Sequence, residues 1–418
     1  MGKRPSDGIT KSASQRVSHW DFSRAVNRAS TTMLVECYVA EYVGRTRGVN
    51  GRSCGRRWDL HSVPLLSVYR NTCQRKGFGE YVMMKNLFLL SLVFFAWPQI
   101  QTPNGHWLDV RDFGAKADCK ADDSPAILAA VQAAIARGQG GGNVVYFPPT
   151  RSGCGYKIGS PLALPWTAYL RVTLLFDGGL GFGSTLTINN GYNLIGNSGG
   201  GTSFADDRLA LFGVGNAPPN PIIHIQGCGI RLENIDMKFV HGTSNGILVD
   251  NHSCQVTLKN VWVQMGDENT KGVPLKIVGG FGYHIEGGSY VSKGAHAIEI
   301  DDDPRCNWTG IVRMRGTFLS GYGVFLNEYC GGINSLSFED ILFENVREPF
   351  LNVNALGGSG VWNIRITDVN YADTIVSGTP LINVKSPVKR VKQFNISNAT
   401  MDKGPIAAGD PIQDLHVQ

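Results

Sequence analysis

Acidic side chains gather in one part of this sequence, where they could carry acid–base chemistry. Asp301, Asp302 and Asp303 are consecutive, and Glu328 follows one repeat later. Hydrolysis of a glycosidic bond uses two carboxyl groups, one of which protonates the leaving oxygen. Crowded carboxylates repel one another, so at least one of the pKa values should be raised, as a general acid requires. We therefore predict catalytic roles for these four residues.

The acidic cluster lies within a stretch that repeats. From Leu232 to Ala399 a four-residue pattern returns seven times. Its first residue is apolar, its second is variable, its third is Asn, Asp or Gly, and its fourth is small or apolar. The intervals are 26, 27, 29, 24, 28 and 30 residues. The third positions are Asn234, Asn260, Gly287, Gly316, Asp340, Asp368 and Asn398. Each repeat holds short β-rich runs without a helical period, which indicates stacked supersecondary units.

The fold class that this pattern favours is all-β, a right-handed parallel β-helix in which each coil turns through short strands. Leucine-rich repeats are excluded because Leu-x-x-Leu-x-Leu is absent. An antiparallel β-sandwich with chance similarity between its strands is the alternative. Strands of neighbouring coils in a β-helix lie about 4.8 Å apart. The Asn, Asp and Gly residues of the pattern are predicted to adopt a left-handed backbone conformation in a tight turn.

Coil stacking brings the ends of the second strand of each repeat into one column. The column and its edge hold Asp250, Asp301, Asp302, Asn327, Glu328 and Asn354. Equivalent residues lie about 5 Å apart on adjacent coils and about 10 Å apart on alternate coils. These separations match the two geometries of glycoside hydrolysis. We predict that substrate is bound by Asp250, Asn327 and Asn354 and by the nearby aromatic residues Trp308, Tyr322 and Tyr329.

The acidic residues also have a structural interpretation. Asp and Asn are common turn residues, and Asp303-Pro304 can begin a turn. A solvated turn is therefore the alternative to a catalytic site. Hard oxygen ligands at Asp301–Asp303 would suit calcium. No other cofactor or metal is predicted, since the histidines of the coils lack a metal-ligand spacing.

The N-terminal part of the chain differs from the rest. Residues 1–82 hold 14 Lys and Arg against 6 Asp and Glu, whereas residues 83–418 hold 25 against 28. A short basic start and an apolar run follow in residues 83–97, in the form of a secretory signal peptide. We predict a signal peptide at 83–102, translation from Met83 or Met84, and an untranslated 1–82. A genuine disordered basic leader is the alternative. The near-neutral body argues against a nucleic-acid partner.

The main domain, 103–418, opens with a predicted helix near 125–137. Ser124 is a good N-cap and Pro125 fits the first helical position. The residues around this helix resemble the N-terminal motif of the pectate lyase superfamily, in its rhamnogalacturonase-like branch. The motif is carried by Asp112, Gly114, Ala115, Asp122, Asp123, Ala126, Ile127, Gly141, Gly142, Phe147, Pro148 and Tyr156. The resemblance implies a pectin-lyase-like parallel β-helix whose N-terminal mouth is covered by the helix.

The resemblance supports the fold more than one reaction. Family members include hydrolases, lyases and phage tailspikes. At 149–155 several residues replace the single usual Gly of the motif. Polygalacturonases carry a His-Gly element after their acidic elements and then Arg-x-Lys. Here His241-Gly242 precedes the acidic cluster and no Arg-x-Lys follows it, so no polygalacturonase site is carried over.

The functional hypothesis is an exported enzyme that degrades a polysaccharide, most simply a glycoside hydrolase. Asp302 or Asp303 would protonate the leaving oxygen, and Glu328 or Asp301 would activate water. The first alternative is a non-catalytic glycan-binding β-helix of the tailspike or adhesin type, and the second is a polysaccharide lyase. The predicted partner is a polysaccharide or surface glycan. No membrane span is expected, because the apolar run is too short to cross a bilayer.

The cysteines test the alignment of the coils. Cys228 and Cys254 each lie four residues before the pattern, and Cys306 and Cys330 each lie eight before it. Each pair thus occupies one position on consecutive coils, about 4.8 Å apart, inside the Cα separation that a disulfide accepts. We predict Cys228–Cys254 and Cys306–Cys330 as inter-coil disulfides. Cys119 and Cys154 are left to pair with each other, and stacked reduced thiols are the alternative.

Overall fold

The structure is a computed structural model in which the chain divides into two units, Met1–Met84 and Lys85–Gln418. It describes residues 107–418 except 139–142, 151–153, 168–169, 197–201, 204–218, 240–243, 266–270, 373–375, 388–389 and 402–403. The predicted basic leader at 1–82 and signal peptide at 83–102 lie outside the described residues. No helix in the described part is long and apolar enough to cross a membrane.

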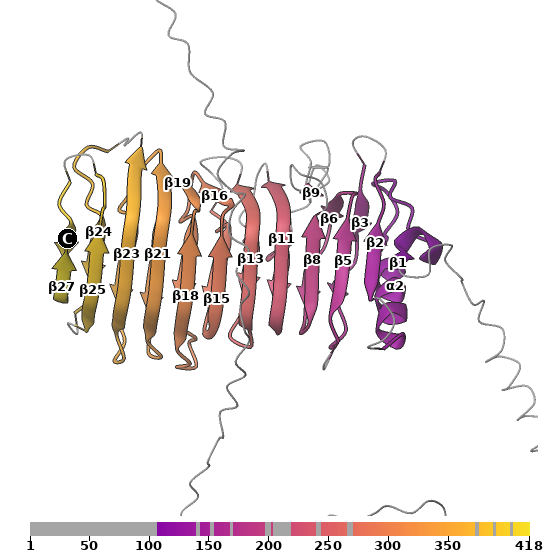
Figure 1. The fold of residues 1–418 in the computed structure, drawn as a ribbon, viewed down its shortest axis with the longest axis horizontal. Helices are drawn as coiled ribbons and strands as arrows, with labels where there is room; N and C mark the ends of the chain where they lie inside the picture. Colours follow the sequence, from indigo (N-terminus) through magenta and orange to yellow (C-terminus); the bar gives the residue numbers. More distant parts are fainter. Residues whose placement is uncertain are drawn as a thin grey trace, which may run out of the picture. The chain divides into compact units, whose positions relative to one another are not determined.

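The described chain winds repeatedly through two long sheets (Figure 1). We call the first the front sheet. Its strands are β1 (Trp107–Asp109), β2 (Val144–Phe147), β5 (Val172–Phe176), β8 (Tyr192–Gly196), β9 (Thr202–Ser203), β11 (Cys228–Phe239), β13 (Cys254–Met265), β15 (Gly280–Glu286), β16 (Ser289–Ser292), β18 (Thr309–Arg315), β19 (Phe318–Gly321), β21 (Ile333–Glu344), β23 (Val361–Ala372), β25 (Val391–Ser397) and β27 (Gln413–Val417).

The second long sheet, which we call the back sheet, is built from shorter strands. They are β4 (Leu162–Ala163), β7 (Leu186–Ile188), β10 (Ile223–Ile225), β12 (Ile247–Val249), β14 (Leu275–Val278), β17 (Ile298–Asp301), β20 (Val324–Glu328), β22 (Leu351–Ala355), β24 (Ile382–Lys385) and β26 (Ala407–Gly409). A small third sheet pairs β3 (Tyr156–Ile158) with β6 (Leu180–Phe182). Front-sheet and back-sheet strands pair in parallel with the coils before and after them. This parallel pairing confirms the β-helix and excludes the antiparallel sandwich.

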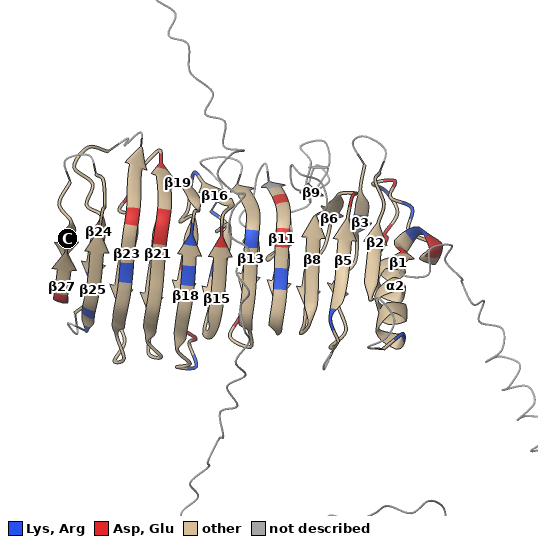
Figure 2. Cartoon of the chain, in the orientation of Figure 1, with Lys and Arg blue, Asp and Glu red and all other residues tan. Residues whose placement is uncertain are grey.

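Alternation along each strand separates a buried face from an outer face. Leu232, Leu258, Ile285, Met314 and Phe338 are register partners on successive coils, and all five are buried. Charged residues lie on front-sheet strands such as β11, β18, β21 and β23 (Figure 2), and Arg313, Arg315 and Arg365 among them are exposed. The apolar core therefore lies inside the coils.

The predicted left-handed turns are present at all seven repeats. The third residue of each pattern has a positive φ of 50–65°, as in Asn234, Asn260 and Gly287. Asn260 donates a side-chain hydrogen bond of 3.1 Å to Asn234 on the preceding coil. Asn, Asp and Gly tolerate this backbone conformation best, which explains why the pattern repeats.

A single α-helix is found among the described residues, α2 (Ser124–Ala136), after the 3₁₀ helix η2 (Val110–Phe113). It begins one residue earlier than expected, with Asp123 at the N-cap position instead of Ser124. The Asp123 carboxylate does not cap the helix and instead accepts backbone hydrogen bonds from Lys116 and Lys157. Its apolar face joins the core beside β1 (Figure 1). Its function as a cap of the coils stays a prediction.

Both predicted inter-coil disulfides are present. Cys228–Cys254 and Cys306–Cys330 have Cα separations of 4.4 and 4.9 Å. The predicted Cys119–Cys154 bridge is absent, since both residues are thiols. Neither residue belongs to a paired strand, so no register fixes them at stacked positions. Burial and a hydrogen bond with Cys154 raise the pKa of the Cys119 thiol to about 11.

Candidate functional site

The outer face of the back sheet carries the predicted polar column. Val278 pairs with Asp301, Asp301 with Asn327, Asn327 with Asn354, and Asn354 with Lys385. The stacking of Asp301 on Asn327 and Asn354 is therefore as the repeat alignment predicts. Asp250 follows Val249, the partner of Ile277, so it shares the level of Val278. It stands two strands, about 10 Å, from Asp301.

Asp301 lies at the centre of a charged cluster that also includes Lys276 and Glu299. The Lys276 ammonium lies 2.9 Å from Asp301 Oδ2 and 2.7 Å from Glu299 Oε2. Because both oxygens contact the same Lys276 nitrogen, Asp301 Oδ2 and Glu299 Oε2 lie at most 5.6 Å apart. The side chain of Asp301 is 6% exposed, that of Glu299 18% and that of Lys276 25%. The cluster is thus a largely covered site with two carboxylates and one cation.

The environment of Asp301 suits a group that exchanges a proton near neutral pH. Burial raises the pKa of Asp301 to about 6, although the Lys276 charge acts in the opposite direction. The charges of Glu299 and Asp302 add to the increase. Asp301 Oδ1 is buried and has no hydrogen-bond partner among the described residues. A buried carboxyl with one unused oxygen can hold a proton and donate it.

Amide and phenol groups extend the site along the column. Asn354 Nδ2 donates a hydrogen bond of 2.7 Å to Asn327 Oδ1. Asn327 Nδ2 in turn donates to the Tyr329 hydroxyl. The Tyr329 side chain is 45% exposed, and burial of its hydroxyl together with the Asp301 charge raises its pKa. The structure therefore brings Asn327, Asn354 and Tyr329 together beside Asp301, as substrate-binding residues would require.

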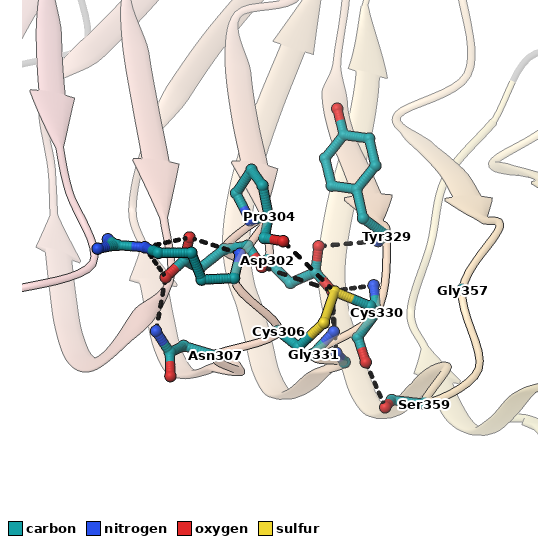
Figure 3. Close-up of a disulfide and its surroundings, with 12 residues drawn as sticks. Asp302, Pro304, Cys306, Asn307, Tyr329, Cys330, Gly331, Gly357 and Ser359 are labelled. Atoms are coloured by element: carbon teal, nitrogen blue, oxygen red, sulfur yellow. Dashed lines mark hydrogen bonds and ion pairs between the residues drawn. A yellow bond between two sulfur atoms is a disulfide. The ribbon is translucent and has the colours of Figure 1, made fainter.

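Asp302 points away from this strip and into the next turn of the chain. Its carboxylate accepts backbone N–H groups from Tyr329 and Cys330 at 2.8 Å each, from Gly331, and from Gly332 at 3.0 Å. Figure 3 shows this arrangement beside the Cys306–Cys330 disulfide. The side chain is fully buried. These contacts favour the turn interpretation of Asp302 over the catalytic one.

Glu328 likewise accepts backbone N–H groups of a turn, one coil further on. It is fully buried and accepts the backbone N–H of Gly357 at 2.9 Å and that of Ser359 at 3.3 Å. Gly357 permits the approach, because a Cβ at this position would lie 2.4 Å from Glu328 Oε1. Glu328 is thus a turn-holding carboxylate without an open path to a substrate on the back sheet.

Asp303 and Asp250 are also satisfied by local donors. Asp303 accepts side-chain hydrogen bonds from Asn251 and Asn307 and pairs with Arg305. Burial alone would raise its pKa, but these donors outweigh burial and hold the pKa near about 2. Asp250 pairs with His224 at 3.0 Å, and its pKa is lowered because hydrogen bonds from His224 and the backbone outweigh burial. Neither carboxyl suits a general acid.

The donor contacts also bear on the calcium expectation. The oxygens of Asp302 and Asp303 face N–H donors, which occupy the positions that a cation would take. In the described ranges no group of three or more His, Cys, Asp or Glu residues is placed to hold a metal ion. Calcium binding at Asp301–Asp303 stays a prediction, and N–H donors already contact the oxygens of Asp302 and Asp303.

Two predicted aromatic contacts lie elsewhere. Trp308 stacks on Phe281 with ring centroids 6.1 Å apart, and it covers Gly310 of the front sheet. The short turn after Asp303 carries the chain to the other sheet within a few residues, so nearness in sequence did not place Trp308 beside Asp301. Tyr322 precedes β20 and packs edge-on against His296, at the opposite end of that strand from Asn327.

Two residues of the cluster were missed by the sequence argument, Lys276 and Glu299. They are register partners on β14 and β17, two positions before the column that contains Asp301. The signal was present in the repeat alignment, since residues i and i−2 of a strand share a face. Comparing the residues two positions before Val278 and Asp301 on their strands would have found Lys276 and Glu299.

Comparisons with known proteins add to the description of the fold. No protein-family model and no curated protein sequence matches the chain. The solved structures that resemble it include the Yersinia enterocolitica family 28 exopolygalacturonase, at a TM-score of 0.42 and 10% identity over 75% of this chain and 78% of that one. The chain's own parallel coils and its N-terminal motif carry the fold assignment. The structure is a parallel β-helix, which is the fold that the resemblance of the N-terminal motif to the pectate lyase superfamily implies.

Other structures with a similar fold differ in function. The A-module of the Azotobacter vinelandii mannuronan C-5 epimerase AlgE6 has a TM-score of 0.40 and 16% identity, over 74% of this chain and 98% of that one. The Streptococcus pneumoniae surface protein and adhesin PfbA has a TM-score of 0.30 and 15% identity, over 74% and 96%. Because these TM-scores are below 0.5, the likenesses carry no argument about the reaction of this chain.

Proposed function

We propose that this chain is an exported polysaccharide-degrading enzyme, a glycoside hydrolase whose site is the Asp301 cluster on the back sheet. The observation that carries the proposal is the buried Asp301 carboxyl, with its raised pKa and its unpartnered Oδ1. Glu299 supplies a second carboxylate beside it. Two inter-coil disulfides support export, since disulfides persist in oxidising compartments.

The proposed reaction assigns one role to each member of the cluster. Protonated Asp301 donates its proton to the glycosidic oxygen as the bond to the anomeric carbon breaks. Glu299 attacks that carbon, and water assisted by ionised Asp301 then releases the sugar. The limit of 5.6 Å between Asp301 Oδ2 and Glu299 Oε2 is below the roughly 6.5–9.5 Å of inverting enzymes. Hydrolysis at this pair would therefore retain the anomeric configuration.

A panel of polysaccharides incubated with the purified chain tests the proposal. Hydrolysis releases reducing ends without new ultraviolet absorbance, and proton NMR of the first product reports the retained configuration. A lyase would instead give an unsaturated, ultraviolet-absorbing sugar. Release of that product, or inversion at the anomeric carbon, would contradict the proposed mechanism.

A non-catalytic glycan-binding β-helix is the second candidate function. It is favoured by the hydrogen bonds that Asp302, Asp303 and Glu328 make to turn donors, because these bonds remove three of the four carboxylates predicted for catalysis. Binding to a polysaccharide of the panel without any turnover would support this candidate over the hydrolase.

The pH profile of hydrolysis provides a test of Asp301 as the acid. Since the pKa of Asp301 is about 6, its protonated form dominates below that pH, and kcat/KM should fall as pH rises through about 6. The Lys276 ammonium acts to lower this pKa. Lys276→Met should therefore move the descending limb to higher pH. A limb that stays in place or moves to lower pH would exclude Asp301 as its origin.

Metal removal should leave the protein unaffected. Because Asp302 and Asp303 accept N–H donors instead of facing a vacant pocket, we expect EDTA to change neither turnover nor Tm. A loss of turnover that added calcium chloride restores would show that a cation belongs to the site.

A further inference from the structure

A continuous groove crosses the outer face of the front sheet, on a different sheet from Asp301. One hollow of about 700 Å³ extends across β15, β18, β21 and β23, and a second of about 470 Å³ reaches β27. The two share Arg315, Glu339, Arg365 and Asn395 in their walls. We call this combined hollow the front-sheet groove. The polysaccharide-degrading site proposed above does not use it.

One row of side chains crosses the floor of the front-sheet groove. Register pairing aligns His284, Arg313, Ser337, Arg365 and Asn395 on five successive strands. Arg313 and Arg365 are exposed and stand on alternate strands, about 10 Å apart, with the Ser337 hydroxyl between them. Figure 2 shows bands of Lys or Arg on β18 and β23, on either side of β21. The row therefore presents two cations at a fixed separation.

The guanidinium groups of Arg313 and Arg365 are available to a ligand. Neither forms a hydrogen bond or ion pair with any residue that the structure describes. Of the other charged side chains in the groove walls, Arg315 pairs with Asp340 at 3.2 Å and Glu339 accepts a hydrogen bond of 2.9 Å from Ser337. The carboxylates of Glu286 and Asp368 also line the groove. A free guanidinium forms two parallel hydrogen bonds to a planar anion such as a carboxylate, and it binds sulfate in a similar way.

Aromatic side chains border the same strands at their starts. Phe281 and Trp308 stack with their rings 11° from parallel, and they are 44% and 42% exposed. Gly310 lets the indole lie flat on the sheet, because a Cβ there would be 2.2 Å from the Trp308 ring. Trp362 continues the row two strands further on. Aromatic faces of this kind pack well against ring-shaped ligands with an apolar face, such as sugars.

We propose that the front-sheet groove is a non-catalytic binding site for an anionic polysaccharide. Arg313 and Arg365 bind two acidic groups along the polymer, Ser337 and Asn395 hydrogen-bond its hydroxyls, and Trp308 with Phe281 packs on a sugar ring. The groove holds the polymer on the outer face of the front sheet, whatever the reaction at Asp301.

Affinity electrophoresis and calorimetry of the whole chain test this site. The probes are polygalacturonate, which carries carboxylates, dextran sulfate, which carries sulfates, and neutral dextran. Arg313→Gln combined with Arg365→Gln should weaken binding to the preferred anionic polymer by at least about tenfold, since charged hydrogen bonds are lost. Trp308→Ala should weaken it further. Tighter binding of polygalacturonate would assign the groove to carboxylates, and tighter binding of dextran sulfate would assign it to sulfates.

A matched control is available in the same row. Arg231 stands two strands before His284 on the sheet but is ion-paired with Glu233, so Arg231→Gln should leave the affinity unchanged. Repeating the comparison of the double variant with its parent in an Asp301→Asn background, where the polymer should not be hydrolysed, separates binding at the groove from the proposed hydrolysis. Unchanged affinity in the double variant, an equal loss in Arg231→Gln, or equally tight binding of neutral dextran would each overturn the proposal.

Discussion

Asp301→Asn should lower kcat by about 10²–10⁴-fold, the range for loss of one acid–base group. Asparagine keeps the shape of the side chain but has no proton to donate. The buried Oδ1, which is unpartnered among the described residues, is the atom that would carry that proton. Lys276 keeps Glu299 as its partner at 2.7 Å in the variant, so the local structure should survive. Initial rates on the preferred polysaccharide, with circular dichroism as a check on folding, measure the effect.

The matched control for this variant is Asp112→Asn. Asp112 is an exposed carboxylate of η2, far along the chain from the back-sheet column. Its substitution is the same change of residue type and should leave kcat unchanged. Turnover by Asp301→Asn close to that of the unchanged protein would reject Asp301 as the acid. The chain would then be a polysaccharide lyase or a glycan-binding protein whose site uses other residues.

The sequence was sufficient to predict the coils because one signal repeats along them. Each third-position Asn, Asp or Gly marks a left-handed turn, and seven copies fix the register of the strands between them. The two inter-coil disulfides followed from that register alone. Cys119 and Cys154 lie outside the repeats, and the prediction of a third bridge was wrong where no register supported it.

The candidate site could be predicted only in part. The repeat alignment correctly stacked Asp301 on Asn327 and Asn354. It could not tell on which side of the chain the next residues project. After β17 the chain leaves the sheet, so Asp302 and Asp303 turn toward N–H donors while Asp301 stays on the outer face. The identity of the donors depends on the shape of the next coil's turn, which a linear pattern does not contain.

The largest expected effect on stability comes from Asp302→Asn. The Asp302 carboxylate accepts four backbone N–H groups in the turn of residues 329–332. An amide leaves one oxygen to accept and directs an NH₂ group at the remaining donors. Buried donors without a partner each cost about 1–3 kcal/mol, so the free energy of unfolding should fall by about 2–4 kcal/mol in total. Urea denaturation followed by circular dichroism measures this loss.

Glu328→Gln is the variant with which the stability loss of Asp302→Asn should be compared. Glu328 holds the next turn through only two backbone N–H groups, at 2.9 and 3.3 Å, so its loss should destabilise the chain less than Asp302→Asn does. Both variants should retain most of their turnover at temperatures where they stay folded, because neither carboxylate faces the Asp301 cluster. If Asp302→Asn were as stable as the unchanged protein but inactive, the carboxylate would be catalytic, and the assignment of the turn as its function would be wrong.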